Sequence, residues 1–194
     1  MRIFVATSNL GKVGELRALL FGHTLEPLPT GFVLPEETGT TYEANARLKA
    51  EAVSCALGVV ALGDDSGLEV AALHQAPGLY SARYAPDRFA YEAQDAANRR
   101  HLLAELERSG IAPPWPARFV CWLALAQPGN ATQVFHGEAA GEVVPQAQGL
   151  GGFGYDPLLF YPPLGATFAQ LSDDDKNRFS HRAKAVAALR KVIA

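Results

Sequence analysis

The sequence predicts an α/β fold in which a mixed β-sheet is flanked by helices. The first observation is that apolar runs of strand length alternate along the chain with longer stretches whose apolar residues recur at helical spacing. The second is the segment 118–126, which is apolar on both faces, as is typical of a strand in the middle of a sheet. With 194 residues, 48% of them hydrophobic, the chain is expected to form a single domain over residues 1–194 with a sizeable core.

The chain opens with a predicted buried strand over residues 2–7, which carries the apolar run RIFVAT. A helix is predicted over residues 10–20, because apolar residues recur there on one side of a helical repeat. The apolar face of that helix is expected to comprise Leu10, Val13, Leu16 and Leu20.

The clearest helix is predicted over residues 40–58. Thr40 and Glu43 match the S/T-x-x-E pattern of a capping box, which marks a helix N-terminus. The apolar stripe of this helix is expected to comprise Ala44, Leu48, Ala52 and Cys55. Three polar residues share another face, at spacings of three and seven positions: Tyr42, Asn45 and Lys49.

A hairpin is predicted next, with short strands over residues 59–62 and 68–73. The intervening sequence GDDSG is rich in Asp, Ser and Gly, which are favoured residues of tight turns. The remaining elements follow from the same patterns. They are a charged helix over 92–108, strands over 118–126, 133–144 and 157–161, and a closing helix over 180–193 with Ser180 as its N-cap.

Composition argues against several classes of protein. The net charge is −3 and no run of Lys or Arg is present, so no nucleic-acid partner is expected. No apolar run approaches the roughly 20 residues that span a bilayer, so no membrane partner is expected either. Cys55 and Cys121 lie among apolar residues without a CxxC pattern. We interpret them as buried free thiols, which fits a cytoplasmic location.

The segment GLGGFGYDPL, residues 149–158, contains a literal G-x-G-x-x-G. In dinucleotide-binding folds these glycines follow a strand and open a helix, which binds the phosphates. Here a strand-like run follows instead of a helix, so that interpretation is rejected. We interpret the glycines as a loop that comes close to a ligand, with Phe153 and Tyr155 offering flat faces. The alternative is a glycine-rich loop that only turns the chain.

Positive charge occurs at two predicted helix N-termini, where the helix dipole disfavours cations. Lys12 lies in the first turn after TSNLGK, residues 7–12, and His181 and Arg182 lie in the first turn of the closing helix. A bound anion would explain both, because backbone N–H groups at such positions bind phosphate. The segment 7–12 is not a P-loop, since it lacks the first Gly and the final Ser or Thr. The alternative for Lys12 is an ordinary solvated lysine with Asn9 as the cap.

Acidic residues are also concentrated at two places. Glu36 and Glu37 precede the helix at 40–58, and Asp64 and Asp65 are adjacent in GDDSG. Because adjacent carboxylates repel, one role for such a pair is to hold a divalent cation, and Mg²⁺ with a triphosphate is plausible chemistry for it. A polar turn is the alternative. A serine hydrolase using Ser66 and His181 is disfavoured, because no G-x-S-x-G is present.

Six segments in the same order make the chain resemble the inosine/xanthosine triphosphate pyrophosphatase family over nearly its whole length. They are TSNLGKVGEL, EETGTTYEANARLKA, DDSGLEV, APGLYSARY, GGFGYDPLL and SHRAKA. The resemblance implies Mg²⁺-dependent hydrolysis of ITP, dITP and XTP to the monophosphate and pyrophosphate, which cleanses the nucleotide pool. It also implies an elongated mixed sheet, two lobes with a central active-site cleft, and a homodimer.

The resemblance also implies residue roles. Glu37 and Asp65 would bind Mg²⁺, with Asp65 also the general base, while Lys49 would contact phosphate and Ser66 the substrate. The triphosphate would be held by Thr7, Ser8, Asn9, Leu10, Gly11 and Lys12. The nucleobase pocket would comprise Phe153, Gly154, Tyr155, Asp156, Lys176, His181 and Arg182.

Discrimination would need a donor aimed at the purine O6, supplied by Arg182 or His181, because adenine presents an amino group there. Two other functions stay open. One is a related pyrophosphatase acting on modified pyrimidine nucleotides. The other is a nucleotide-binding module without catalysis, which would bind a nucleotide but not turn it over.

Overall fold

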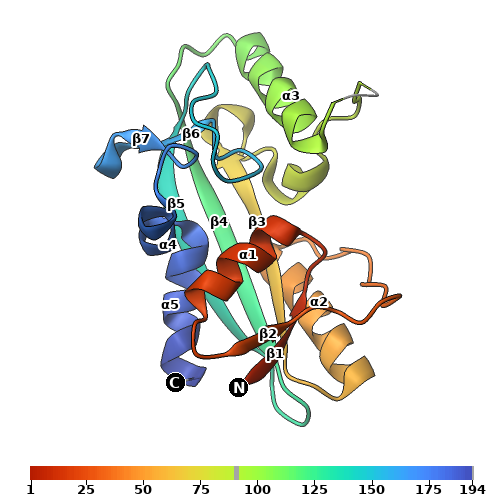
Figure 1. The fold of residues 1–194 in the computed structure, drawn as a ribbon. Helices are drawn as coiled ribbons and strands as arrows, with labels where there is room; N and C mark the ends of the chain where they lie inside the picture. Colours follow the sequence, from red (N-terminus) through yellow and green to blue (C-terminus); the bar gives the residue numbers. More distant parts are fainter. Residues whose placement is uncertain (90–91, 194) are drawn as a thin grey trace. The chain divides into compact units, whose positions relative to one another are not determined.

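The computed structural model describes residues 1–89 and 92–193, and a mixed β-sheet flanked by helices runs through it (Figure 1). In these residues seven strands are hydrogen-bonded in the order β2-β1-β3-β4-β5-β6-β7. The strands are β1 (Arg2–Ala6), β2 (Thr24–Glu26), β3 (Ala61–Val70), β4 (Trp115–Ala126), β5 (Gln133–Val143), β6 (Leu159–Tyr161) and β7 (Ala166–Thr167). Strand β1 pairs in parallel with β2 and β3, whereas β6 pairs antiparallel with β5 and β7, so the predicted mixed sheet is confirmed.

Five α-helices accompany these strands in the described ranges. They are α1 (Leu10–Leu19), α2 (Tyr42–Leu57), α3 (Gln94–Arg108), α4 (Asp173–Phe179) and α5 (His181–Ile193). Short 3₁₀ turns are η1 (Ala71–Leu73), η2 (Gly78–Arg83) and η3 (Pro162–Leu164). In the part of the chain that the structure describes, no helix is long and apolar enough to cross a membrane.

The chain divides into two compact units. The first comprises Met1–Asp65, Cys121–Gly137 and the chain from His181 onward. The second comprises Ser66–Val120 and Glu138–Ser180. An elongated shape and a central cleft between two lobes stay predictions.

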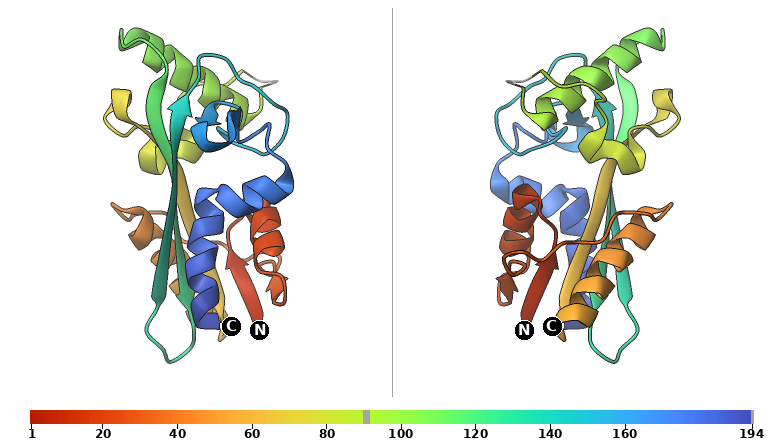
Figure 2. Two further views of the ribbon diagram at one scale, coloured as in Figure 1. Left: turned by 90° about the vertical axis from the view of Figure 1, so that its left-hand side faces the viewer. Right: turned by 90° about the vertical axis from the view of Figure 1, so that its right-hand side faces the viewer.

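In the first unit, helices cover both faces of the sheet. Leu123 and Leu125 of β4 pack in one apolar cluster with residues of α1 and α5, while Ala124 and Ala126 pack in another with α2. Successive side chains of a strand point to opposite faces. Helices α1 and α5 therefore lie on one face and α2 on the other, as Figure 2 shows.

The second unit has its own apolar core. Leu102 and Leu106 of α3 are fully buried there against Leu68 of β3 and Phe119 of β4. The core therefore fixes α3 by its apolar side, and the polar residues of the same helix are available for other contacts.

Strand β3 differs from its prediction. No hairpin turn interrupts GDDSG, and the strand runs continuously from Ala61 to Val70. Its first half pairs in register with β1, with Leu62 beside Val5 and Gly63 beside Ala6. Local turn propensity is weak compared with pairing in a sheet. The two carboxylates also find buried partners, described below, which they would lack in a solvated turn.

Helix α2 begins at Tyr42, two residues after the start of the predicted range, and its N-cap lies one residue later than predicted. Thr41, not Thr40, is the N-cap, and its hydroxyl accepts a hydrogen bond from the Ala44 N–H at 3.1 Å. The buried face also differs, because Cys55 is exposed and the face turned to the sheet carries both small and polar residues. The buried residues are Tyr42, Asn45, Ala46, Lys49, Ala50, Val53 and Ser54. Of the two thiols predicted to be buried, only Cys121 is so.

Helix α1 is confirmed with one correction on its apolar face. Leu16 and Leu20 are fully buried, but Leu10 is 84% exposed because it stands at the very start of the helix. Asn9 is the N-cap, which the sequence offered only as part of the alternative for Lys12, and it accepts a hydrogen bond from the Lys12 N–H at 3.1 Å. The closing helix starts at His181, and Ser180 lies in extended backbone between α4 and α5. Helix α4 and the short strands β2 and β7 were not predicted.

The close approach of α2 to β3 requires glycine at position 63. A Cβ there would lie 2.1 Å from the backbone oxygen of Ala46, which a helix cannot easily move. We expect Gly63→Ala to lower the free energy of unfolding by about 2 kcal/mol, as in overpacked cores, measured by urea denaturation.

Gly14→Ala is the matched control for that variant. Gly14 lies in α1, and an added Cβ there meets nothing within 4 Å. Because Ala is a better helix former than Gly, this change is expected to stabilise the protein by about 0.5–1 kcal/mol. Equal effects of the two substitutions would contradict the close packing at Gly63.

Candidate functional site

Two adjacent carboxylates on β3 organise the charged residues of the first unit. Asp64 and Asp65 are neighbours on a continuous strand, so their side chains point to opposite faces of the sheet. Asp64 contacts residues of α1 and α5, and Asp65 contacts residues of α2. The predicted pair therefore acts as two separate groups, each with its own partners.

Asp64 is completely buried and is held by two cations. Its Oδ1 lies 2.7 Å from Lys12 Nζ, and its Oδ2 accepts a hydrogen bond from Arg182 Nε at 2.7 Å. Arg182 is itself 1% exposed and also donates to Glu15. Burial alone would raise the pKa of Asp64, but the charges of Arg182 and Lys12 outweigh it and hold the pKa well below its usual range. Asp64 is therefore an ionised anchor for both cations.

A buried thiol also contacts Asp64. Cys121 Sγ lies 3.6 Å from Asp64 Oδ2. Burial, with the nearby Asp64 charge, raises the pKa of the Cys121 thiol, so the thiol stays protonated and donates to the carboxylate. The alternative of an ordinary solvated lysine at position 12 is wrong, since its ammonium is paired with Asp64.

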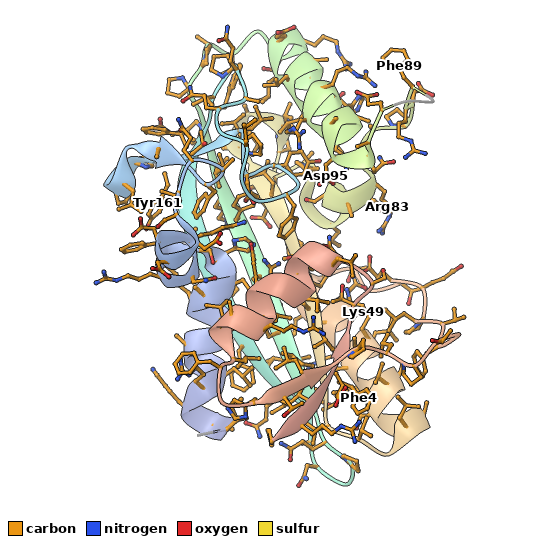
Figure 3. The ribbon with its side chains drawn as sticks, viewed as in Figure 1. Phe4, Lys49, Arg83, Phe89, Asp95 and Tyr161 are labelled. Atoms are coloured by element: carbon orange, nitrogen blue, oxygen red, sulfur yellow. The ribbon has the colours of Figure 1, made fainter. Side chains whose placement is uncertain are left out.

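Asp65 lies in a second cluster, formed with α2 and the segment before it. Its Oδ1 is 3.3 Å from Lys49 Nζ, and its Oδ2 accepts a hydrogen bond from Asn45 Nδ2 at 3.2 Å. Lys49 Nζ also donates to Glu37 Oε1 at 2.6 Å. Asn45 accepts a hydrogen bond from the Gly39 N–H at 2.8 Å, which fixes the chain close to Glu37. Figure 3 labels Lys49 in this region.

The charges of this second cluster shift its pKa values. Burial raises the pKa of Asp65, although the Lys49 and Lys12 charges oppose the rise. Burial alone would lower the pKa of Lys49, but the negative charges of Asp65 and Glu37 outweigh it and raise the pKa. A carboxylate with a raised pKa beside a fixed ammonium has the properties of a general base.

The donor chemistry of Glu37 and Asp65 fits a hard divalent cation. Both carboxylates contact the same ammonium of Lys49, so both reach one position. Within residues 1–89 and 92–193, no group of three His, Cys, Asp or Glu side chains is placed to hold a metal ion. Mg²⁺ commonly takes one or two carboxylates and completes its octahedron with waters and substrate phosphates. Two carboxylates are thus sufficient for Mg²⁺ bound together with a phosphate ligand.

The segment 7–12 caps the N-terminus of α1. The Thr7 hydroxyl accepts a hydrogen bond from the Asn9 N–H at 3.1 Å, and Ser8 and Asn9 are exposed. The start of the helix therefore presents a polar segment next to an ordered cation, an arrangement suited to an anion.

In the second unit, the glycine-rich segment is a loop and no helix follows it, as predicted. The Phe153 N–H donates to Asp156 Oδ2 at 2.8 Å, and Lys176 Nζ lies 2.6 Å from the same oxygen. Lys176 Nζ also lies 4.9 Å from the centre of the Phe153 ring. Gly152 has a φ of 69°, and a Cβ there would lie 2.1 Å from Asp156 Oδ2. This glycine is therefore required for the contact between Asp156 and the backbone.

The predicted site residues lie in three clusters, two in the first unit and one in the second. The structure brings Lys12 and Arg182 together on Asp64, Glu37 and Lys49 together with Asp65, and Phe153 and Asp156 together with Lys176. His181 is buried at the start of α5, and Ser66 is half-buried on β3. The base-binding roles of His181 and Arg182 stay predictions.

Some contributing residues were not found from the sequence. Glu15 shares α1 with the charged residues Lys12 and Arg17, and nothing in its neighbourhood in the sequence indicates a buried partner. Asp95 and Arg99 of α3 hydrogen-bond the backbone of Gly154, yet in the sequence they resemble ordinary surface charges. Their spacing of four residues was the only available signal.

Comparisons with known proteins identify the family of this chain. The model of the Ham1 family matches residues 3–192. The dITP/XTP pyrophosphatase of Exiguobacterium sibiricum is 43% identical, over 100% of this chain and 97% of that protein. The dITP/XTP pyrophosphatase of Haemophilus ducreyi is 45% identical, over 99% of this chain and 98% of that protein.

Solved structures agree with this assignment. The Staphylococcus aureus Ham1 protein superimposes with a TM-score of 0.84 at 38% identity and covers 100% of this chain and 98% of its own. A nucleoside-triphosphatase / dITP/XTP pyrophosphatase from Mycobacterium abscessus superimposes with a TM-score of 0.72 at 37% identity, over 97% of this chain and 98% of its own. The resemblance drawn from the six motifs is thus confirmed, and the chain belongs to the Ham1 family.

Proposed function

We propose that the chain hydrolyses non-canonical purine nucleoside triphosphates, namely ITP, dITP and XTP, to the monophosphate and pyrophosphate. The observation that carries the proposal is Asp65, a buried carboxylate with a raised pKa that contacts Lys49 and shares that lysine with Glu37. Relatives named dITP/XTP pyrophosphatase that match the whole chain support the substrate class.

The residues of the second cluster would activate water. Asp65 would accept the proton of the attacking water, and the rise of its pKa through burial makes the carboxylate a stronger base. Glu37 and Asp65 would hold Mg²⁺, which neutralises phosphate charge when bound. Lys49, fixed by both carboxylates, would contact the phosphates.

The segment 7–12 and the charged residues around Asp64 would bind the triphosphate. The polar segment 7–12 offers backbone N–H groups at a helix N-terminus, and Asp64 holds the Lys12 ammonium close to it. A preorganised cation needs no rearrangement when the phosphates arrive, which is the property that electrostatic catalysis requires.

The loop of the second unit would bind the base. Phe153 would stack on the purine, with Gly154, Tyr155 and Asp156 as its backbone support and Lys176 beside the ring. His181 or Arg182 would donate to O6 of the base. Adenine presents an amino group at that position, so its binding would leave the buried donor unpaired. The proposal also includes a homodimer and a cytoplasmic location, for which size-exclusion chromatography and cell fractionation are the tests.

A substrate panel tests the proposed function. The protein is incubated with Mg²⁺ and ITP, XTP, dITP, ATP, GTP or dTTP, and pyrophosphate and orthophosphate are quantified separately. Pyrophosphate from ITP, XTP and dITP, with little from the others, is expected. Orthophosphate would mean cleavage at the outer bond. Turnover of dTTP instead would favour the alternative of a pyrimidine nucleotide pyrophosphatase. ITP binding without any product would favour a binding module.

Removal of the metal is expected to abolish turnover, and Glu37→Gln is expected to weaken the response to Mg²⁺. Loss of one of two carboxylate ligands should raise the Mg²⁺ concentration for half-maximal activity at least about tenfold. The measurement is a Mg²⁺ titration of ITP hydrolysis after treatment with EDTA. Glu36→Gln, an exposed neighbour, is the control. An unchanged titration of the Glu37 variant would exclude its carboxylate as a ligand.

Phe153→Ala is expected to raise KM for ITP about tenfold or more, because stacking of one base on an aromatic ring is worth about 1–3 kcal/mol. Steady-state kinetics with ITP measure this effect. Phe21→Ala removes a phenyl ring that is 67% exposed in the first unit and should leave KM unchanged. If both variants keep the KM of the original protein, Phe153 does not stack on the base.

A further inference from the structure

We infer that Asp95 and Arg99 of α3 are positioning residues that set the place of Phe153 and thereby the affinity for the base; this inference rests on the proposed function. Neither residue belongs to the motifs that identify the family. Both are half-buried, and Figure 3 labels Asp95 on α3.

The two side chains hold one loop residue by both of its backbone groups. The Gly154 N–H donates to Asp95 Oδ2 at 2.7 Å, and the Gly154 carbonyl accepts from Arg99 Nη1 at 2.6 Å. Residues four apart on a helix lie on the same side, one turn apart, so Asp95 and Arg99 form a clasp that faces the loop. Bonds to charged groups are the stronger class of hydrogen bond.

The clasp acts on Phe153 through the backbone. Phe153 directly precedes Gly154, and its own N–H donates to Asp156 at 2.8 Å. On the other side of the clasp, the Tyr155 hydroxyl donates to the Ser81 carbonyl at 3.0 Å, and burial raises the pKa of Tyr155, which keeps this donor protonated. The backbone is therefore fixed before, at and after Gly154, which leaves the Phe153 ring one narrow range of positions.

Helix α3 is a rigid support for this clasp. Asn98 Nδ2 donates to the Ser81 carbonyl at 3.2 Å, and Asn98 Oδ1 accepts from the Ala85 N–H at 2.9 Å. Leu102 and Leu106, in the later turns of the helix, are buried in the core of the second unit. Because these other residues hold α3 in place, removal of the Asp95 carboxylate releases the loop without removing the helix from the core.

The test compares a ligand that carries the base with one that does not. Binding of IMP and of inorganic tripolyphosphate is measured by calorimetry for Asp95→Ala, Asp95→Asn and Arg99→Ala, together with KM and kcat for ITP. Asp95→Ala and Arg99→Ala are expected to weaken IMP binding and raise KM for ITP about tenfold, the lower end of what loss of a hydrogen bond to a charged group causes. Binding of tripolyphosphate should stay unchanged, and kcat should change much less than KM.

Asp95→Asn is the rescue variant, because its amide oxygen still accepts from the Gly154 N–H, and it should recover most of the IMP affinity. Arg108→Ala is the matched control: Arg108 is at the other end of α3 and its side chain is 65% exposed. This variant should behave as the unmodified protein.

Unchanged IMP binding in Asp95→Ala would overturn the inference. A parallel loss of IMP and tripolyphosphate binding, together with a lower melting temperature, would also overturn it, because it would show a purely structural role. Failure of the unmodified protein to hydrolyse ITP is a different result and would contradict the proposed function itself. If the unmodified protein hydrolyses ITP and the Asp95 and Arg99 variants bind IMP as it does, the inference fails but the proposed function stands.

Discussion

Asp65→Asn is expected to lower kcat for ITP about 10³-fold while the protein stays folded. The amide keeps the shape of the side chain but cannot accept the proton of the attacking water, and a general base contributes about 10²–10⁴-fold. The loss of a negative ligand would also weaken Mg²⁺ binding. The measurement is single-turnover hydrolysis of ITP at saturating Mg²⁺, with circular dichroism as the check on folding.

The matched control is Asp174→Asn, which neutralises an exposed carboxylate in the first turn of α4. It should leave kcat within about twofold of the original value, because a surface substitution far from special features has little effect. A folded Asp65→Asn variant with nearly full activity would refute Asp65 as the base.

Asp64→Asn is expected to lower the free energy of unfolding by about 3–5 kcal/mol, the cost of removing one partner from a buried ion pair. Arg182, which is 1% exposed, would lose the negative charge of Asp64 while it keeps its contact with Glu15, and Lys12 would lose its ion pair with Asp64. Urea denaturation at neutral pH measures the loss. A decrease below about 1 kcal/mol would mean that the two cations find solvent or other partners.

The same variant has a signature in its pH dependence. Because the pKa of Asp64 is lower in the folded protein than its ordinary value of 3.8, ionised Asp64 contributes stability above that pH. This contribution is lost as the pH falls from 3.8 through the folded-state pKa. The original protein should therefore lose stability in that acidic range more steeply than Asp64→Asn does. Equal slopes would mean that Asp64 is not an ionised anchor.

The general fold could be predicted from the sequence because strands and helices have distinct apolar periods. Helices α1, α3 and α5 and the central strand β4 were found in this way. The same method failed at β3, since Asp, Ser and Gly favour turns locally and only the pairing with β1 makes this segment extended. Helix α4 was missed because its seven residues are too few to show a period.

The candidate site could be predicted in its residue types but not in its contacts. Asn45 and Lys49 were placed on one helix face, yet their burial depends on the small residues Ala46 and Gly63, whose close contact is visible only in three dimensions. The separation of Asp64 from Asp65 could not be predicted while the segment was interpreted as a turn. Base-binding and metal-binding roles depend on ligands and are the subject of the experiments above.

The alternation of side chains along β3 has a consequence for insertions and deletions. A shift of one residue in this strand would exchange the two aspartates between faces, placing the anchor beside α2 and the base beside α1 and α5. Point substitutions at Asp64 and Asp65 can be studied one at a time, but a one-residue insertion between Ala61 and Asp64 would change both environments at once. In a library of single-codon insertions and deletions, the stretch from Ala61 to Asp65 should therefore be among the least tolerant segments of the chain.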